Sequence, residues 1–236
     1  SDNVLELDDL TIRFKLKRGE LTAVNGVSFS VNRGETFGLV GESGSGKTVT
    51  ARSIMRLIPM PPGEIVKGKV LFEGDSVYDK SDSEMREMRG KKVAMVFQEP
   101  MSALNPVFTV GSQIGDALRT NMGLSKQEAA ERVVELLSLV GIPSPASRLD
   151  SYVHEFSGGM RQRVMLAMAL SCDPTFLIAD EPTTALDVTI QATILELIES
   201  MIDRFGMSLI FITHNLGVVA HACDTCLLYT SDAADE

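Results

Sequence analysis

Apolar residues follow two different periods along this chain, and the change of period predicts its organisation. Alternating or continuous apolar segments near the N-terminus are typical of half-buried and fully buried strands. These segments are residues 5–14, 27–31, 36–40, 69–75 and 92–97. Between the third and fourth of them we expect a helix from Thr48 to about Ile58, ended by the proline-rich segment 59–64.

The character changes to helices and loops from Gln98 to about Phe156. Ser125 followed by Glu128 forms a capping-box pattern, which predicts a helix that ends near Gly141. Strand–helix alternation then returns, with helices expected over 158–170 and 189–205 and strands over 175–180 and 208–213. Such alternation favours an α/β fold with a parallel sheet covered by helices.

Composition narrows the class of protein. The formal net charge of −10, from 22 basic and 32 acidic residues, argues against an extended nucleic-acid surface. No apolar run approaches the ~20 residues that cross a bilayer, and the acidic N-terminus lacks the pattern of a signal peptide. We therefore expect a cytosolic chain with reduced cysteines, including the Cys223-x-x-Cys226 pair.

GESGSGKT at residues 41–48 has the spacing of a phosphate-binding loop and lies between a predicted buried strand and a helix. Glycines allow the backbone N–H groups to approach phosphate oxygens, and the helix N-terminus favours an anion. We expect Lys47 to reach the β- and γ-phosphates and Thr48 to bind Mg²⁺. The alternative is a glycine-rich turn without a ligand. The expected nucleotide contacts are Gly41, Ser43, Gly44, Ser45, Gly46, Lys47, Thr48 and Val49.

Asp180 is the last residue of the predicted strand 175–180, and Glu181 follows it directly. A carboxylate at the end of such a strand can hold Mg²⁺, and the next residue can polarise a water molecule for attack on the γ-phosphate. A solvated acidic turn is the alternative. Because the chain also contains a phosphate-binding loop, the pair favours a P-loop NTPase in which Asp180 binds metal and Glu181 is catalytic.

Ser157, Gly158 and Gly159 lie at the start of the predicted helix 158–170 and offer a second anion-binding helix start, although an ordinary helix cap is possible. With this stretch, written FSGGM, the chain resembles the ATP-binding cassette ATPases, whose signature is usually Leu-Ser-Gly-Gly-Gln. The resemblance covers about residues 4–224. The stretches 98–114, 154–170 and 178–195 are similar to the ATPases of oligopeptide, dipeptide and nickel importers.

Other motifs of that family occur here in the family's order. Gln98 matches the Q-loop glutamine, Ala185-Leu186-Asp187 the D-loop, and His214 the switch histidine. The resemblance implies that Gln98 contacts Mg²⁺ and water and that His214 positions the γ-phosphate. Phe14 is a candidate for stacking on adenine, although a strand Phe is more often a core residue.

The resemblance also implies a RecA-like core of residues 1–98 and 157–226, with an N-terminal antiparallel β subdomain and an inserted helical subdomain at 99–156. Two cassettes would pair head to tail, identical or paralogous, with ATP and Mg²⁺ between Lys47 of one and Ser157–Gly159 of the other. The insertion would dock a transmembrane permease at the cytoplasmic face of the membrane, served indirectly by a substrate-binding protein.

Residues 227–236 depart from the family pattern and read as a foreign or truncated tail, and a cysteine-rich C-terminal extension of some relatives is missing. Leu227–Tyr229 could still add to a strand, and we expect 231–236 to fray. Two rival interpretations stay open: a soluble cassette ATPase acting on DNA or ribosomes, and a fragment that binds ATP without turnover.

Overall fold

The computed structural model describes residues 2–183 and 187–229. The chain divides into two compact units. The first unit comprises Ser1–Arg86 and Ser208–Glu236, and the second Glu87–Met207. In the described ranges, no helix combines the length and the apolar character that crossing a bilayer requires.

An antiparallel sheet forms the N-terminal part of the first unit. Its strand order is β2 (Gly19–Asn32), β1 (Asn3–Leu16), β4 (Gly63–Phe72) and β5 (Asp75–Ser76). The two N-terminal strand predictions are confirmed, and both strands are longer than predicted. The strand expected at 69–75 is corrected, because β4 begins at Gly63, opposite Phe14 of β1. Pairing with β1 extends β4 over residues 63–68, which the sequence pattern did not indicate as part of a strand.

Three parallel strands form the other sheet of this unit. β3 (Thr36–Gly41) lies between β8 (Ser208–Thr213) and β9 (Thr225–Tyr229). β3 is buried from its second residue onward, as its continuous apolar run predicts. The expectation that Leu227–Tyr229 could join a strand is confirmed by the pairing of β9 with β3. Residues 230–236, including the expected frayed end, lie outside the described residues.

Three helices accompany these strands: α1 (Lys47–Ile54), α2 (Asp82–Glu87) and α7 (Leu216–Ala222). The helix expected to reach Ile58 ends four residues earlier. Arg56 adopts a left-handed backbone with φ of 50°, and its guanidinium donates hydrogen bonds at 2.6 Å to the Lys80 carbonyl and to Asp82. The helix thus ends before the proline-rich segment 59–64, at a point where Arg56 makes contacts with residues distant in the sequence. The sequence period did not indicate α2 and α7, which are short.

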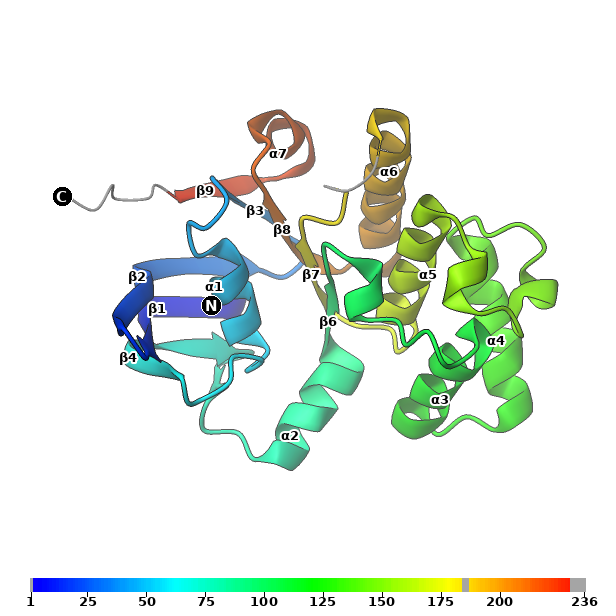
Figure 1. Cartoon of the computed structure of the whole chain (residues 1–236), viewed down its shortest axis with the longest axis horizontal. Helices are drawn as coiled ribbons and strands as arrows, with labels where there is room; N and C mark the ends of the chain where they lie inside the picture. The colour runs from blue at the N-terminus through cyan, green and yellow to red at the C-terminus, as the bar shows by residue number, and fades with distance from the viewer. Residues whose placement is uncertain (1, 184–186, 230–236) are drawn as a thin grey trace. The chain divides into compact units, whose positions relative to one another are not determined.

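The second unit combines two parallel strands with a group of helices. β6 (Val93–Val96) pairs with β7 (Phe176–Asp180). Figure 1 shows α3, α4 and α5 side by side, in green to yellow. The helices are α3 (Val110–Met122), α4 (Lys126–Leu139), α5 (Gly158–Leu170) and α6 (Val188–Phe205). Parallel strands with helices in both units confirm the α/β fold class.

α4 begins at the predicted capping box. The Ser125 backbone donates to Glu128 at 2.8 Å, and the Glu128 backbone N–H donates to the Ser125 hydroxyl at 3.3 Å. Residues 99–156, all of which the structure describes, form helices and short 3-10 turns but no β-strand. The boundaries assigned above to a helical subdomain stay a prediction.

Candidate nucleotide-binding site

The phosphate-binding loop joins the end of β3 to the start of α1, the context that the motif requires. Gly44 and Gly46 have φ of 84° and 95°, which only glycine adopts readily. A Cβ atom on Gly46 would also overlap the Ala23 carbonyl oxygen of β2. The loop conformation is therefore tied to glycine by backbone geometry and by the packing of β2.

Lys47 is the most enclosed polar residue of this loop, with 4% of its surface exposed. Its Nζ atom donates to the carbonyl oxygens of Gly41 and Glu42, each at 2.7 Å, and to the Ser45 hydroxyl at 3.2 Å. The ammonium group thus lies inside the ring of loop atoms. A phosphate oxygen at the mouth of the loop would offer it a charged acceptor.

The first turn of α1 is fixed by contacts that sequence reasoning did not find. The Thr50 hydroxyl donates to the Gly46 carbonyl at 3.0 Å and lies 2.8 Å from the Tyr229 hydroxyl. Burial raises the pKa of Tyr229 to about 12. Gly41 has no room for a side chain, because a Cβ atom there would lie 2.8 Å from the Tyr229 Cβ atom. No sequence signal connects Tyr229 with residues 41–50, since only the β3–β9 register brings them together.

Phe14 and His214 also belong to the first unit. Phe14 is half-buried on β1, opposite Gly63, and its ring lies 3.4 Å from where a Gly63 Cβ atom would stand. His214 is exposed immediately after β8. The next residue, Asn215, caps α7 by accepting the Gly217 N–H at 2.9 Å.

In the second unit, Asp180 and Glu181 lie at the carboxyl end of β7 in different environments. Asp180 is the last strand residue and only 5% exposed, whereas Glu181 is half-buried. Glu181 has a left-handed φ of 46°, a conformation that costs a non-glycine residue about 1–2 kcal/mol. The left-handed backbone at Glu181 turns the chain directly after the strand residue Asp180. One buried carboxylate and one accessible carboxylate suit different chemical roles.

The Ser157–Gly159 turn opens α5. The Ser157 hydroxyl accepts the Met160 N–H at 3.3 Å, which confirms its prediction as an N-cap. Gly159 packs on α6, because a Cβ atom there would lie 3.1 Å from Cγ2 of Ile190. Arg161 holds the preceding 3-10 turn by donating to the Val153 carbonyl at 3.1 Å. These contacts support the helix start, where Ser157 and Gly158 are exposed.

Gln98 and Asp187 complete the predicted residues of this unit. Gln98 is exposed two residues after β6. Asp187 caps α6, accepting the Thr189 and Ile190 N–H groups at 3.1 Å each. The D-loop assignments to Ala185 and Leu186 lie outside the described residues. The predicted residues thus form two groups, one in each unit.

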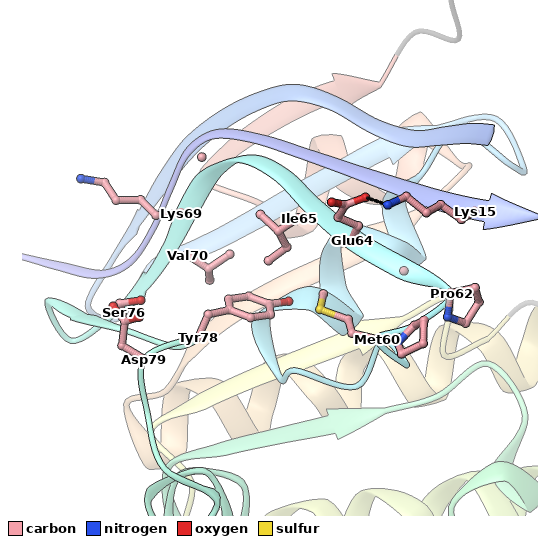
Figure 2. Close-up of a pocket in the computed structure, with 13 residues that line it drawn as sticks. Lys15, Met60, Pro62, Glu64, Ile65, Lys69, Val70, Ser76, Tyr78 and Asp79 are labelled. Atoms are coloured by element: carbon pink, nitrogen blue, oxygen red, sulfur yellow. Dashed lines mark ion pairs between the residues drawn. The ribbon is translucent and has the colours of Figure 1, made fainter.

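A cavity of about 590 Å³ lies on another part of the first unit (Figure 2). Its walls include Met60, Val70 and Tyr78, and an ion pair of 2.8 Å joins Lys15 to Glu64 beside it. None of the predicted nucleotide-binding residues lines it. Within the described residues, no three His, Cys, Asp or Glu side chains gather as a metal-binding group.

Comparisons with known proteins place these motifs in a family context. A family model described as ABC transporter matches residues 24–184. The oligopeptide transport ATP-binding protein OppD of Bacillus subtilis (strain 168) is 55% identical over 221 residues, which are 94% of this chain and 62% of OppD. The dipeptide transport ATP-binding protein DppD of the same strain is 50% identical over 235 residues, which are 99% of this chain and 70% of DppD. This chain thus spans roughly two thirds of the length of these curated relatives.

Among solved structures, the fold matches a dimeric post-hydrolysis state of the ATP-binding cassette MJ0796 bound to ADP and Pi. The TM-score is 0.84 at 25% sequence identity, over 96% of this chain and 94% of the other. The antiparallel sheet, the parallel strands and the helices described above are therefore those of a cassette fold.

Proposed function

Because the chain belongs to the ABC transporter family, we propose that it is the ATP-hydrolysing subunit of a peptide importer. The observation that carries this proposal is that one chain presents two glycine-containing helix starts, at α1 and at α5. Each offers backbone N–H groups and the positive end of a helix to an anion.

Two anion-binding helix starts on one chain are explained by a head-to-tail dimer. ATP bound by the 41–48 loop of one protomer would meet Ser157–Gly159 of its partner, so each ATP would close the interface. The MJ0796 cassette, which shares this fold, is dimeric in its post-hydrolysis state with ADP and Pi bound. Loss of the γ-phosphate would remove the bridge between protomers and allow the dimer to open.

Within each site, the residues divide the work of phosphoryl transfer. Lys47 would bind the β- and γ-phosphates, and Glu181 would orient the attacking water and accept its proton. His214 would contact the γ-phosphate, and Phe14 would stack on adenine. The backbone N–H groups of the loop around Ser43, Gly44 and Ser45, together with those of Thr48 and Val49, would hold the α- and β-phosphates.

The candidate metal ligands fit Mg²⁺ in their chemistry. Thr48 offers a hydroxyl, Gln98 a carboxamide oxygen and Asp180 a carboxylate, and hard cations prefer such oxygen ligands. Asp180 is 5% exposed, as suits a carboxylate whose charge is balanced by a cation. Mg²⁺ held there would neutralise charge that develops on the phosphates.

An apolar surface in the second unit is suited to a permease. Met101, Val107 and Phe108 are exposed by 44%, 74% and 56%. The loop that carries the last two is held by Gln113, which accepts the Asn105 N–H at 2.8 Å and donates to the Phe108 carbonyl at 3.0 Å. Ordered, exposed apolar side chains indicate a binding surface. We infer that it docks a cytoplasmic segment of the membrane subunit, so that the chain would lie at the cytoplasmic face of the membrane.

Peptide as the transported solute rests on OppD and DppD, whose names give oligopeptide and dipeptide transport. A substrate-binding protein would deliver the peptide to the permease. Co-purification with a permease rather than with nucleic acid is the expected behaviour, and it separates this proposal from a soluble cassette ATPase.

Mixed dimers test the head-to-tail arrangement. In one preparation, one protomer carries Lys47→Ala and its partner carries Gly158→Glu. In the matched preparation, a single protomer carries both changes and its partner is unchanged. Both contain the same substitutions, and Glu181→Gln in every protomer prevents turnover.

If ATP lies between protomers, the first preparation keeps one intact site and retains one ATP per dimer after gel filtration, whereas the second retains none. The opposite result would show that each chain builds its site alone, and the dimer proposal would be wrong.

A further inference from the structure

Two side-chain amides hold the backbone directly after Glu181. The Nε2 atom of Gln162, on α5, donates to the Pro182 carbonyl, and the Nε2 atom of Gln191, on α6, donates to the Thr183 carbonyl at 2.9 Å. All four residues belong to the second unit. Two consecutive carbonyls are therefore fixed by two different helices.

The segment that they hold has an unusual backbone. Glu181 is in the left-handed region, and Pro182 has no N–H with which to join a hydrogen-bond ladder. The pairing of β7 with β6 ends at Ala179. External donors therefore supply the hydrogen bonds that would otherwise come from a strand or a helix.

The contact of Gln162 is one whose loss would cost free energy, because the side chain is buried. It is 1% exposed, so its amide would be left unsatisfied if the Pro182 carbonyl moved away. A buried amide that spans two elements makes the position of one element depend on the other.

The same helix carries the Ser157–Gly159 turn at its start. Gln162 is the fifth residue of α5, about one turn beyond Gly158. Gly159 packs against Ile190, which neighbours Gln191 on α6. The glycine turn, the two glutamines and the segment after Glu181 thus belong to one connected cluster.

We propose that Gln162 and Gln191 are positioning residues that couple the glycine turn at Ser157–Gly159 to the orientation of Glu181. The inference rests on the proposed function. In a head-to-tail dimer, the Ser157–Gly159 turn would contact the ATP bound by the partner's 41–48 loop, whereas Glu181 would act on the ATP bound by the loop of its own protomer. A phosphate bound at the start of α5 would change the position or the mobility of that helix. Because Gln162 is hydrogen-bonded to the Pro182 carbonyl, the backbone at Glu181 would change with it. The two ATP sites of a dimer would therefore hydrolyse cooperatively.

The test is the dependence of ATPase rate on ATP concentration, for the wild type, Gln162→Met and Gln191→Met. Methionine keeps the length of the side chain and removes the donor. Gln127→Met is the matched control, because Gln127 is an exposed helical glutamine that donates to Glu131 at 3.0 Å. Dissociation constants for ATP, measured in the absence of turnover, and melting temperatures are recorded for each variant.

We expect Gln162→Met to lower kcat about 10- to 100-fold, as misplacement of a catalytic group does. The Hill coefficient should fall towards 1, and the Kd for ATP should stay within about twofold of the wild type, since neither glutamine is placed on the nucleotide. Gln191→Met should show the same pattern, and Gln127→Met should match the wild type. If Gln162→Met does not fold, the half-buried Gln191 decides the question alone.

Unchanged kcat and Hill coefficient in both variants would overturn the proposal. So would a loss of activity that only follows the folded fraction, with the Hill coefficient preserved, since that is what a structural role predicts. A wild-type chain without ATPase activity when assembled with its permease would instead contradict the proposed function itself.

Discussion

The Nζ atom of Lys47 donates a hydrogen bond of 2.7 Å to the carbonyl oxygen of Gly41, the last residue of β3. The cation of the phosphate-binding loop is thus held by the strand that precedes the loop. This contact places the positive charge of Lys47 at the loop, where a charged phosphate oxygen would be a stronger acceptor than a carbonyl oxygen.

Lys47→Ala should weaken ATP binding. A charge-assisted hydrogen bond contributes about 1.5–3 kcal/mol, so we expect the Kd to rise roughly 10- to 150-fold. Titration with a fluorescent ATP analogue measures the change. Lys126→Ala, at an exposed position on α4, is the control and should leave the Kd unchanged. Equal Kd values for Lys47→Ala and the wild type would remove Lys47 from the site.

Glu181→Gln should bind ATP normally and lose turnover. The amide keeps the shape of the side chain but cannot accept a proton, so kcat should fall about 10²- to 10⁴-fold. Phosphate release and ATP retention are measured on the same sample. Glu199→Gln, at an exposed position of α6, should have the activity of the wild type. A Glu181→Gln variant with full turnover would defeat the catalytic assignment.

Gly159→Ala should destabilise the contact between α5 and α6. Its Cβ atom would stand 3.1 Å from Cγ2 of Ile190, and such overpacking costs about 1–3 kcal/mol. Ile190→Ala in the same chain removes the obstructing atom and should restore much of the free energy of unfolding, measured with urea. If the double variant is as unstable as the sum of the single ones, the contact does not explain the glycine.

Alkaline unfolding should reveal the burial of Tyr78. Burial raises its pKa from 10.0 to about 12, and its hydroxyl donates to the Ser53 carbonyl at 3.0 Å. Below pH 10 the phenol is protonated in both the folded and the unfolded chain. Between about pH 10 and 12 only the unfolded chain loses the proton. The free energy of unfolding should therefore fall as pH rises, by at most about 2 kcal/mol from this group.

Tyr78→Phe should be about 1 kcal/mol less stable than the wild type at pH 8, through loss of the hydrogen bond. Its stability should then fall less steeply between pH 10 and 12. The remaining slope is expected to come in part from Tyr229, whose pKa is also raised to about 12. Urea unfolding at pH 8, 10 and 11.5 measures both effects, and identical slopes for Tyr78→Phe and the wild type would contradict the role of Tyr78.

Phe108→Ala should uncouple the cassette from its permease. Phe108 is 56% exposed, so its removal should not destabilise the chain by more than about 0.5 kcal/mol. We expect weaker co-purification with the permease and normal ATP binding by the isolated chain. Met122→Ala, also exposed at 42% but at the end of α3, is the control. Equal co-purification of the two variants would argue against this docking surface.

Several local elements of the fold and of the candidate site could be predicted from the sequence alone. The 41–48 loop, the N-cap at Ser157, the capping box of α4 at Ser125 and the carboxylates at the end of the strand 175–180 are each encoded in a short contiguous stretch. Each depends on the residue types at neighbouring positions, such as glycine where φ is positive or a hydroxyl where a helix begins. Local chemistry therefore determined the identity of the parts and their order.

Tertiary structure decided which distant residues support those parts. The contact of Tyr229 with the start of α1, the placement of Gln162 and Gln191 on the carbonyls after Glu181, and the early end of α1 at Ile54 have no counterpart in any sequence period. They arise because strand register and helix packing bring together residues that are far apart in the chain, and pattern within a short window cannot encode such distances. Short stretches of sequence thus encode the residue types of the candidate site, whereas strand register and helix packing select the distant residues that support them.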